Sequence, residues 1–337
     1  MTILVTGGLG YIGSHTVVEL LNNNFEVVII DDLSNTEKFI LKNIEEITGK
    51  KPIFYPFDLK RKELLKQVFD AHKIEGCIHF AAYKAVGESQ EKPIDYYENN
   101  LFSLINLLQE MKERNISNFI FSSSCTVYGQ ADTMPIDENT PLKLPESSYG
   151  KTKQMGEEIL KDFATAHQKK VTLLRYFNPI GAHPSAKLGE LPIGIPNNLV
   201  PYVMQTAAGV REKLSVWGND YETEDGTAIR DYIYVVDLAK AHVKALQKLI
   251  SENSETLVDI YNLGTGKGSS VLEVVHAFEK ANDVAVPYQI CERRAGDITI
   301  AYANADKAEK ELGWKSETSL EEALRTVWQW QKYLETR

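Results

Sequence analysis

The sequence has few cysteines, no apolar stretch long enough to cross a membrane and no excess of positive charge. Its three cysteines, Cys77, Cys125 and Cys291, are far apart and form no paired motif, so we expect reduced thiols rather than disulfides. A formal net charge of −10 excludes the basic surface of a nucleic-acid-binding protein. The seven histidines show no metal-ligand spacing, and we expect no bound metal.

These absences favour a soluble enzyme of the cytoplasm. The first residues already predict a strand rather than a cleaved leader. A hydrophobic content of 43% with 25% charged residues is typical of a globular protein. At 337 residues the chain exceeds one ordinary core, which predicts two domains.

The chain opens with a short apolar run, residues 1–6, followed at once by a glycine-rich turn and a predicted helix over 14–21. Strand, glycine turn and helix occur in this order in dinucleotide-binding folds. Gly7 and Gly10 allow a tight turn and close approach to a pyrophosphate. Gly13 lets the helix pack on the sheet and direct its positive end at the phosphates.

A second predicted strand, residues 25–30, ends in Asp31 and Asp32. A carboxylate at this distance from the glycine turn can bind a ribose diol. The next basic residue is Lys38, so a 2′-phosphate would be repelled. The pattern predicts NAD rather than NADP, although Asp31 could also be a solvated turn residue.

Predicted strands and amphipathic helices alternate through the first half. Further strands are expected at residues 52–59, 77–82, 119–124 and 171–176, and helices at 97–114 and 148–167. This alternation predicts an α/β fold with a doubly wound parallel (Rossmann) sheet, whose ligands bind beyond the carboxyl ends of the strands. Ser124 lies at such an end, and Asp58 and Leu59 at another, within reach of an adenine.

The second half differs in composition. Residues 179–201 are rich in proline, glycine and asparagine, and we expect an ordered, functional loop there before a helix near Leu199. We assign residues 1–178 to an NAD-binding Rossmann domain and 179–337 to a smaller mixed α/β substrate domain. A strand and helix pattern over 233–245 suggests that 233–262 rejoin the first domain.

Tyr149 and Lys153 lie four residues apart, on one face of a predicted helix. An ammonium beside a phenol favours the phenolate, so we expect a lowered pKa and a phenolic base. One such pair can arise by chance on an ordinary surface helix. Beside the glycine turn, however, it points to redox chemistry on a bound dinucleotide.

The glycine turn, the serines at 122–124 and the Tyr149–Lys153 pair resemble the extended short-chain dehydrogenases/reductases. Segments 85–89, 175–185, 194–199 and 225–232 narrow the resemblance, which runs end to end, to the UDP-glucose 4-epimerases. The resemblance implies reversible inversion of C4 between UDP-glucose and UDP-galactose, through a 4-keto sugar and tightly bound NAD.

The resemblance assigns catalysis to Ser124, Tyr149 and Lys153. Tyr149 would take the proton of the 4-hydroxyl while C4 gives a hydride to the nicotinamide, and Ser124 would hydrogen-bond the same oxygen. The ketose would then turn about its link to the nucleotide and take the hydride back on its opposite face. Tyr176 would pack against the nicotinamide.

The resemblance also implies the binding residues. Those for NAD are Gly7, Gly10, Tyr11, Ile12, Gly13, Asp31, Asp32, Asn35, Asp58, Leu59, Phe80, Ala81, Ala82, Lys84, Asn99, Ser122, Tyr149, Lys153 and Tyr176. Those for the UDP-sugar are Lys84, Ser124, Tyr149, Phe177, Asn178, Asn198, Leu199, Val216, Trp217, Arg230, Tyr232, Arg294, Asp297 and Ala301. Arg230 and Arg294 would bind the pyrophosphate and Asp297 the uridine ribose.

Ala301 departs from one pattern of the family. In the family that the chain resembles, the residue at this position faces the 2-substituent of the sugar, where a tyrosine closes the site and a small residue leaves room. We therefore hypothesise that UDP-GlcNAc and UDP-GalNAc are also substrates. The alternative is that other side chains fill the space.

Three other functions stay open. A sugar-nucleotide 4,6-dehydratase would need an Asp-Glu pair after Ser124, where this chain has Cys125 and Thr126. A decarboxylase would need basic contacts to a uronic acid, and a nucleotide-sensing protein would have no use for a phenolic base.

The helices at 97–114 and 148–167 resemble those of a two-fold interface in the family, which predicts a homodimer.

Overall fold

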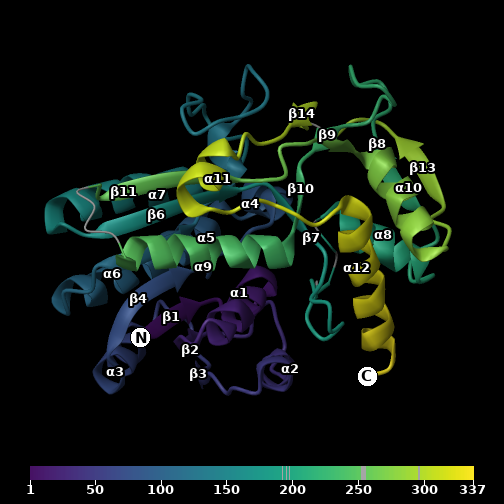
Figure 1. Cartoon of the computed structure of the whole chain (residues 1–337). Helices are drawn as coiled ribbons and strands as arrows, with labels where there is room; N and C mark the ends of the chain where they lie inside the picture. Colours follow the sequence, from purple (N-terminus) through teal and green to yellow (C-terminus); the bar gives the residue numbers. More distant parts are fainter. Residues whose placement is uncertain (192, 195, 197, 252–255, 295–296) are drawn as a thin grey trace.

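The computed structural model describes residues 1–337 except 192, 195, 197, 252–255 and 295–296. At its centre is a seven-stranded sheet with the order β11-β6-β5-β4-β1-β2-β3 (Figure 1). All neighbouring strands in it are parallel. The strands are β1 (Thr2–Thr6), β2 (Glu26–Ile30), β3 (Ile53–Tyr55), β4 (Ile74–His79), β5 (Asn118–Ser122), β6 (Lys170–Tyr176) and β11 (Val258–Leu263).

Successive residues of the central strands are buried on opposite faces of the sheet. In β1, Ile3 and Val5 belong to one hydrophobic core, whereas Leu4 belongs to the other. The strands therefore read as continuous apolar runs, as expected for a parallel sheet covered on both sides. One face carries α1 (Tyr11–Asn22), α2 (Phe39–Thr48) and α9 (Val235–Ser251); the other carries α3 (Lys62–Ala71), α6 (Ser103–Glu113) and α7 (Ser148–His167). The predicted doubly wound sheet is confirmed.

The helix predicted at 97–114 starts differently. The chain forms α5 (Pro93–Tyr97), a π-helical turn (Glu98–Phe102) and then α6. Pro93 begins α5 because a first-turn residue needs no N–H partner. In the π turn the buried side chain of Asn100 bonds to the backbone N–H and carbonyl of Tyr83 and to Thr152. The turn thereby fixes α6 to the strand end after β4.

Beyond β6 the chain builds smaller elements. They are β7 (Asn178–Ile180), α8 (Leu199–Ala207), β8 (Leu214–Trp217), β9 (Ile229–Arg230), β10 (Tyr232–Tyr234), β12 (Ser269–Ser270), α10 (Val271–Asn282), β13 (Tyr288–Cys291), β14 (Ile300–Ala301), α11 (Asp306–Leu312) and α12 (Leu320–Glu335). Strand β11 returns to the edge of the main sheet beside β6. The division into two domains stays a prediction. None of the helices in the described ranges has the length and hydropathy of a membrane span.

The strand order reverses at β1. The chain builds β2 and β3 on one side of β1 and β4, β5 and β6 on the other, so the loops after β1 and β4 diverge and leave a crevice between them. Backbone hydrogen bonds from Gly7 N to Ile30 O (2.8 Å) and from Phe80 N to Thr6 O (3.0 Å) hold these loops at the sheet edge. This edge is where the site forms.

Candidate active site

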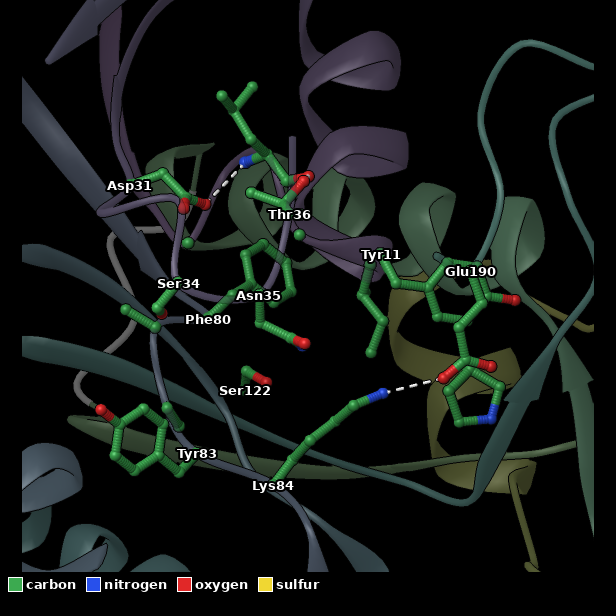
Figure 2. A pocket seen from close by; sticks show the side chains of 18 of the residues that line it. Tyr11, Asp31, Ser34, Asn35, Thr36, Phe80, Tyr83, Lys84, Ser122 and Glu190 are labelled. Carbon is green, nitrogen blue, oxygen red and sulfur yellow. Dashed lines mark hydrogen bonds and ion pairs between the residues drawn. The ribbon is translucent and has the colours of Figure 1, made fainter. Parts of the chain in front are cut away.

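A cavity of about 330 Å³ opens at the carboxyl ends of the parallel strands (Figure 2). The glycine turn lines one part of it, and Ser124, Tyr149 and Lys153 line another. Every residue implied above for NAD lies in its lining. The tertiary structure thus gathers residues from the ends of six strands that are far apart in the sequence.

The glycine turn has no room for side chains. Gly7 has a φ of +68°, and a Cβ there would lie 2.7 Å from the backbone nitrogen of Ala81. A Cβ on Gly13 would lie 2.1 Å from the carbonyl oxygen of Gly7. The turn therefore leads directly into α1 and presents the N-terminal end of this helix to the cavity, an arrangement that suits a pyrophosphate.

Asp31 also braces this turn. Its carboxylate accepts hydrogen bonds from the backbone N–H groups of Leu9 and Leu33, both at 3.0 Å. Burial raises the pKa of Asp31, and these hydrogen bonds oppose that rise. Asp32 binds Ser34 through the backbone N–H and the hydroxyl. An acidic end to β2 fits a ribose diol and disfavours a 2′-phosphate.

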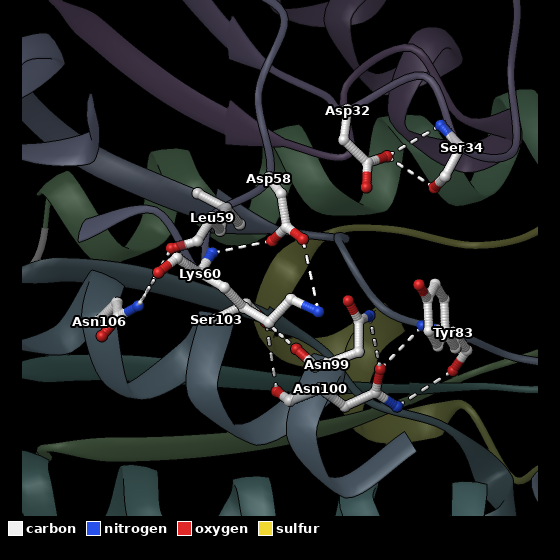
Figure 3. A network of polar contacts seen from close by, with 10 residues as sticks. All are labelled: Asp32, Ser34, Asp58, Leu59, Lys60, Tyr83, Asn99, Asn100, Ser103 and Asn106. Carbon is white, nitrogen blue, oxygen red and sulfur yellow. Dashed lines mark hydrogen bonds and ion pairs between the residues drawn. The ribbon is translucent and has the colours of Figure 1, made fainter. Parts of the chain in front are cut away.

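Polar contacts fix the far wall of the cavity (Figure 3). Asp58 accepts the backbone N–H of Lys60 at 2.8 Å and pairs with its ammonium at 3.4 Å. The amide of Asn106, on α6, donates to the carbonyl of Leu59 at 3.1 Å. Asn99 donates to the side chain of Asn100 at 3.2 Å. The loop after β3 is thereby held against α6.

Ser124 lies beside the Tyr149 hydroxyl, close enough to lower its pKa. The Lys153 ammonium lies 5.8 Å from the centre of the Tyr149 ring and donates a 2.7 Å hydrogen bond to the carbonyl of Ser122. The hydroxyl of Ser122 is hydrogen-bonded to that of Tyr176. The segment at and just after the end of β5 therefore lies against Tyr149, Lys153 and Tyr176, the last residue of β6.

The expected lowering of the Tyr149 pKa is not what the structure gives. Burial raises the pKa of Tyr149, and Ser124 only opposes this rise. Burial also lowers the pKa of Lys153 to about 7, against the attraction of Glu157. Burial removes water from the Tyr149 phenolate and from the Lys153 ammonium. This loss of hydration has a larger effect on both pKa values than the attraction expected between the two charges.

The cavity brings together six of the residues implied for the UDP-sugar: Lys84, Ser124, Tyr149, Phe177, Asn178 and Asn198. The others do not line it: Leu199, Val216, Trp217, Arg230, Tyr232, Arg294, Asp297 and Ala301. These lie at the start of α8, on the short strands β8, β9, β10 and β14, and in the segment before β14. The side chain of Val216 is fully buried in the core, so it presents no surface to a ligand.

A group of arginines lies beside the cavity. Arg230 lowers the pKa of the cavity residue Cys125, although burial raises that pKa overall to about 12. Burial raises the pKa of Tyr232 to about 12, and Arg230 and Arg294 both oppose that rise. Arg294 forms an ion pair with Asp297 at 3.0 Å. Arg230 therefore places a positive charge near Cys125, whose thiol stays neutral, whereas the charge of Arg294 is balanced by Asp297.

Sequence reasoning missed several lining residues, among them Thr36, Tyr83 and Glu190. Glu190 forms an ion pair with Lys84 and accepts a hydrogen bond from Asn198, at 3.0 and 2.8 Å. Glu190 lies in the proline-rich loop at residues 179–201, and its place in this expected functional loop was the sequence signal that could have identified it. Tyr83 and Thr36 are adjacent to residues that were predicted.

The fold and this cavity define a dinucleotide-binding protein of the short-chain dehydrogenase/reductase class. The family described as GDP-mannose 4,6 dehydratase matches residues 4–327. A UDP-glucose 4-epimerase of Bacillus subtilis is 53% identical over 98% of this chain and 97% of its own. The chain belongs to this family and, within it, to the UDP-glucose 4-epimerases.

Solved structures agree. The UDP-glucose 4-epimerase from Bifidobacterium longum in complex with NAD+ and UDP is 48% identical, with a TM-score of 0.95 over 99% of this chain and 98% of its own. The UDP-Glc/GlcNAc 4-epimerase from Campylobacter jejuni is 35% identical, with a TM-score of 0.85 over 98% of this chain and 99% of its own.

Gly13→Ala tests the glycine turn. The added Cβ would overlap the Gly7 carbonyl, and overpacking of this kind costs about 1–3 kcal/mol. We expect the affinity for NAD, measured by calorimetric titration, to fall by about tenfold to a hundredfold. Gly87→Ala is the control, because a Cβ there meets nothing within 4 Å. Unchanged affinity in Gly13→Ala would contradict this role of the turn.

Proposed function

We propose that this chain reversibly inverts C4 of UDP-glucose and UDP-galactose, with NAD bound in the cavity. The observation that carries the proposal is the meeting of Ser124, Tyr149 and Lys153 in the cavity that also contains the glycine turn. The end-to-end likeness to UDP-glucose 4-epimerases supports it, as does the NAD+ and UDP held by the Bifidobacterium longum relative.

NAD, when bound, accepts a hydride from C4 and returns it to either face. Tyr149 takes the proton of the 4-hydroxyl and later returns it to the same oxygen. Ser124 hydrogen-bonds that oxygen. The Lys153 ammonium, held by the carbonyl of Ser122, favours the phenolate form of Tyr149 that accepts this proton.

The UDP portion of the substrate fits the region beside the cavity. Arg230 and Arg294 supply guanidinium groups for a diphosphate, which a protein of net charge −10 must bind through local cations. Asp297, released from Arg294, would bind the uridine ribose. Asn178 and Asn198 extend this contact surface into the cavity itself. If the protein binds the nucleotide firmly and the sugar loosely, the sugar can rotate and present its opposite face to the nicotinamide.

Elimination of water is disfavoured, although the matching family is described as a dehydratase. Cys125 and Thr126 follow Ser124 in the cavity lining. Burial raises the pKa of Cys125 to about 12, so the thiol stays protonated near neutral pH, and neither residue replaces an acid and base pair. These residues therefore favour return of the hydride to the 4-keto sugar over loss of water.

Tyr149→Phe tests the chemical step. Loss of the proton acceptor should lower kcat for UDP-galactose by about 10²–10⁴-fold with little change in KM, measured by chromatographic separation of UDP-glucose from UDP-galactose. Tyr288→Phe, at an exposed position of β13, serves as the control. If the unaltered protein converts neither sugar nucleotide when NAD is supplied, the proposed function is wrong.

The proposal extends to UDP-GlcNAc and UDP-GalNAc. Ala301 pairs with Arg230 in the β9–β14 ladder, so its methyl group lies beside one of the residues proposed to hold the diphosphate. A methyl group leaves space that a large side chain would fill. The relative from Campylobacter jejuni, described as a UDP-Glc/GlcNAc 4-epimerase, supports this extension.

Ala301→Tyr should separate the two substrate classes. A bulky ring should lower kcat/KM for UDP-GalNAc by about tenfold to a hundredfold through steric exclusion, with UDP-galactose nearly unaffected. Ala301→Ser should turn over both sugars. Equal losses for both sugars in Ala301→Tyr would show that Ala301 does not set specificity.

We also propose a homodimer. Apolar side chains are exposed on the outer helices: Ile94 on α5, Phe102 in the π turn, Ile105 on α6 and Met155 on α7. Helices α5 and α7 contact each other, as do α6 and α7, so these side chains belong to one helical layer. Pairing with a second copy would remove this apolar surface from water.

Phe102→Glu should weaken this dimer, because association would bury a carboxylate. We expect light scattering at micromolar concentration to give twice the mass of one chain for the unaltered protein and a shift toward one chain for the variant. Val210→Glu, which alters an exposed apolar residue after α8, should have no effect. A monomeric unaltered protein would overturn the proposal.

The three cysteines are free in the structure. We propose that the protein works in the cytoplasm, where thiols stay reduced.

A further inference from the structure

Three consecutive serines at the end of β5 each have a different partner. The hydroxyl of Ser122 is bonded to Tyr176, and its carbonyl accepts the Lys153 ammonium. The hydroxyl of Ser123 donates to Glu157 at 2.6 Å, and Ser124 lies beside the Tyr149 hydroxyl. The middle serine thus faces away from the proposed chemistry, toward a buried carboxylate.

Glu157 is fully buried and has no contact with solvent. Arg175, itself 2% exposed, donates to both of its carboxylate oxygens, from Nε at 2.9 Å and from Nη2 at 2.5 Å. Arg175 also donates to the Tyr128 hydroxyl at 3.0 Å, which in turn donates to Asn262 on β11 at 2.7 Å. The carboxylate is therefore held by Ser123, after β5, and by Arg175 on β6, and Arg175 is itself linked through Tyr128 to Asn262 on β11.

Tyr149, Lys153 and Glu157 recur every fourth residue along α7. Residues at this spacing lie on one face of a helix, so the proposed base, the ammonium and the buried carboxylate follow one another along one line. Each of them also has a partner on the three-serine segment. Tyr149 and Lys153 line the cavity, whereas the carboxylate lies at the end of this line outside it.

We propose that Glu157 is a positioning residue for the reaction. Fixed by Arg175, it holds Ser123, and with it Ser122 and Ser124, in register with α7, and it places a negative charge one helical turn behind Lys153. The proposal rests on the function proposed above, in which Lys153 supports the Tyr149 phenolate.

The titratable and charged groups around Lys153 determine how loss of the Glu157 charge would change the pKa of this lysine. Tyr149 and Glu157 face it from α7, His79 from β4, and Tyr176 and Arg175 lie at the end of β6. Burial lowers the pKa of His79 to about 3, so this histidine is neutral in the working range. Burial lowers the pKa of Lys153 to about 7, and Glu157 opposes that change. Without the carboxylate, Lys153 should lose its proton at a lower pH.

Two variants divide the role of Glu157 into its parts. Glu157→Gln keeps the shape of the side chain and removes the charge, whereas Ser123→Ala removes one hydrogen bond and keeps the charge. Glu158→Gln is the matched control, because the neighbouring Glu158 is exposed and pairs with Lys161 at the surface. For each protein kcat and KM for UDP-galactose are measured from acid to alkaline pH, with thermal unfolding as a check on folding.

In Glu157→Gln we expect the alkaline limb of kcat to move to lower pH by about one unit, since an ammonium without its counter-charge deprotonates earlier. Ser123→Ala should lower kcat by about tenfold, which corresponds to about 1.4 kcal/mol, with KM and the alkaline limb unchanged. Glu158→Gln should match the unaltered protein in every respect.

An unpaired Arg175 could prevent Glu157→Gln from folding. The double variant Glu157→Gln with Arg175→Met removes both charges, and the alkaline limb should still move to lower pH. A folded variant, single or double, whose limb stays in place would overturn the electrostatic role, and an unchanged kcat in Ser123→Ala would overturn the positioning role. An unaltered protein without activity would instead refute the proposed function.

Discussion

Parallel backbone pairing around β1 is the constraint on which the rest of the structure depends. Because β2 and β3 extend to one side and β4, β5 and β6 to the other, all six strands direct their carboxyl ends at one edge, and the loops separate there. The glycine turn, Asp31 and the three serines all follow the ends of these strands. No two of these groups are neighbours in sequence, and the sheet alone makes them neighbours in space.

Burial then decides the electrostatics of the site. Tyr149 and Lys153 line the cavity from a helix packed against the sheet. Loss of hydration raises the pKa of Tyr149 and lowers that of Lys153. Both shifts disfavour the charged forms that a phenolic base and its supporting ammonium require. The protein offsets part of this cost with fixed partners: Ser124 for the phenol, and the Ser122 carbonyl with the Glu157 carboxylate for the ammonium.

Local patterns predicted much of this arrangement. Helix α7 has the bounds expected from the sequence, Ser148–His167, because Ser147 caps its first turn and the apolar spacing continues to its end. The residues predicted for NAD line the cavity because strand ends and a glycine turn have strong sequence signals. The π turn at Glu98–Phe102 was not predicted, since it depends on where the side chain of Asn100 finds its partners.

The sequence by itself determined the alternating sheet, the glycine turn, the acidic end of β2 and the spacing of Tyr149 and Lys153, because these follow from periodicity and residue type. Only the tertiary structure decided which distant groups meet: Glu190 with Lys84, and Arg175 with Glu157. It also decided the direction of the pKa shifts. Desolvation and long-range pairing depend on what surrounds a side chain in space, and that environment exists only once the sheet and its two layers of helices have assembled.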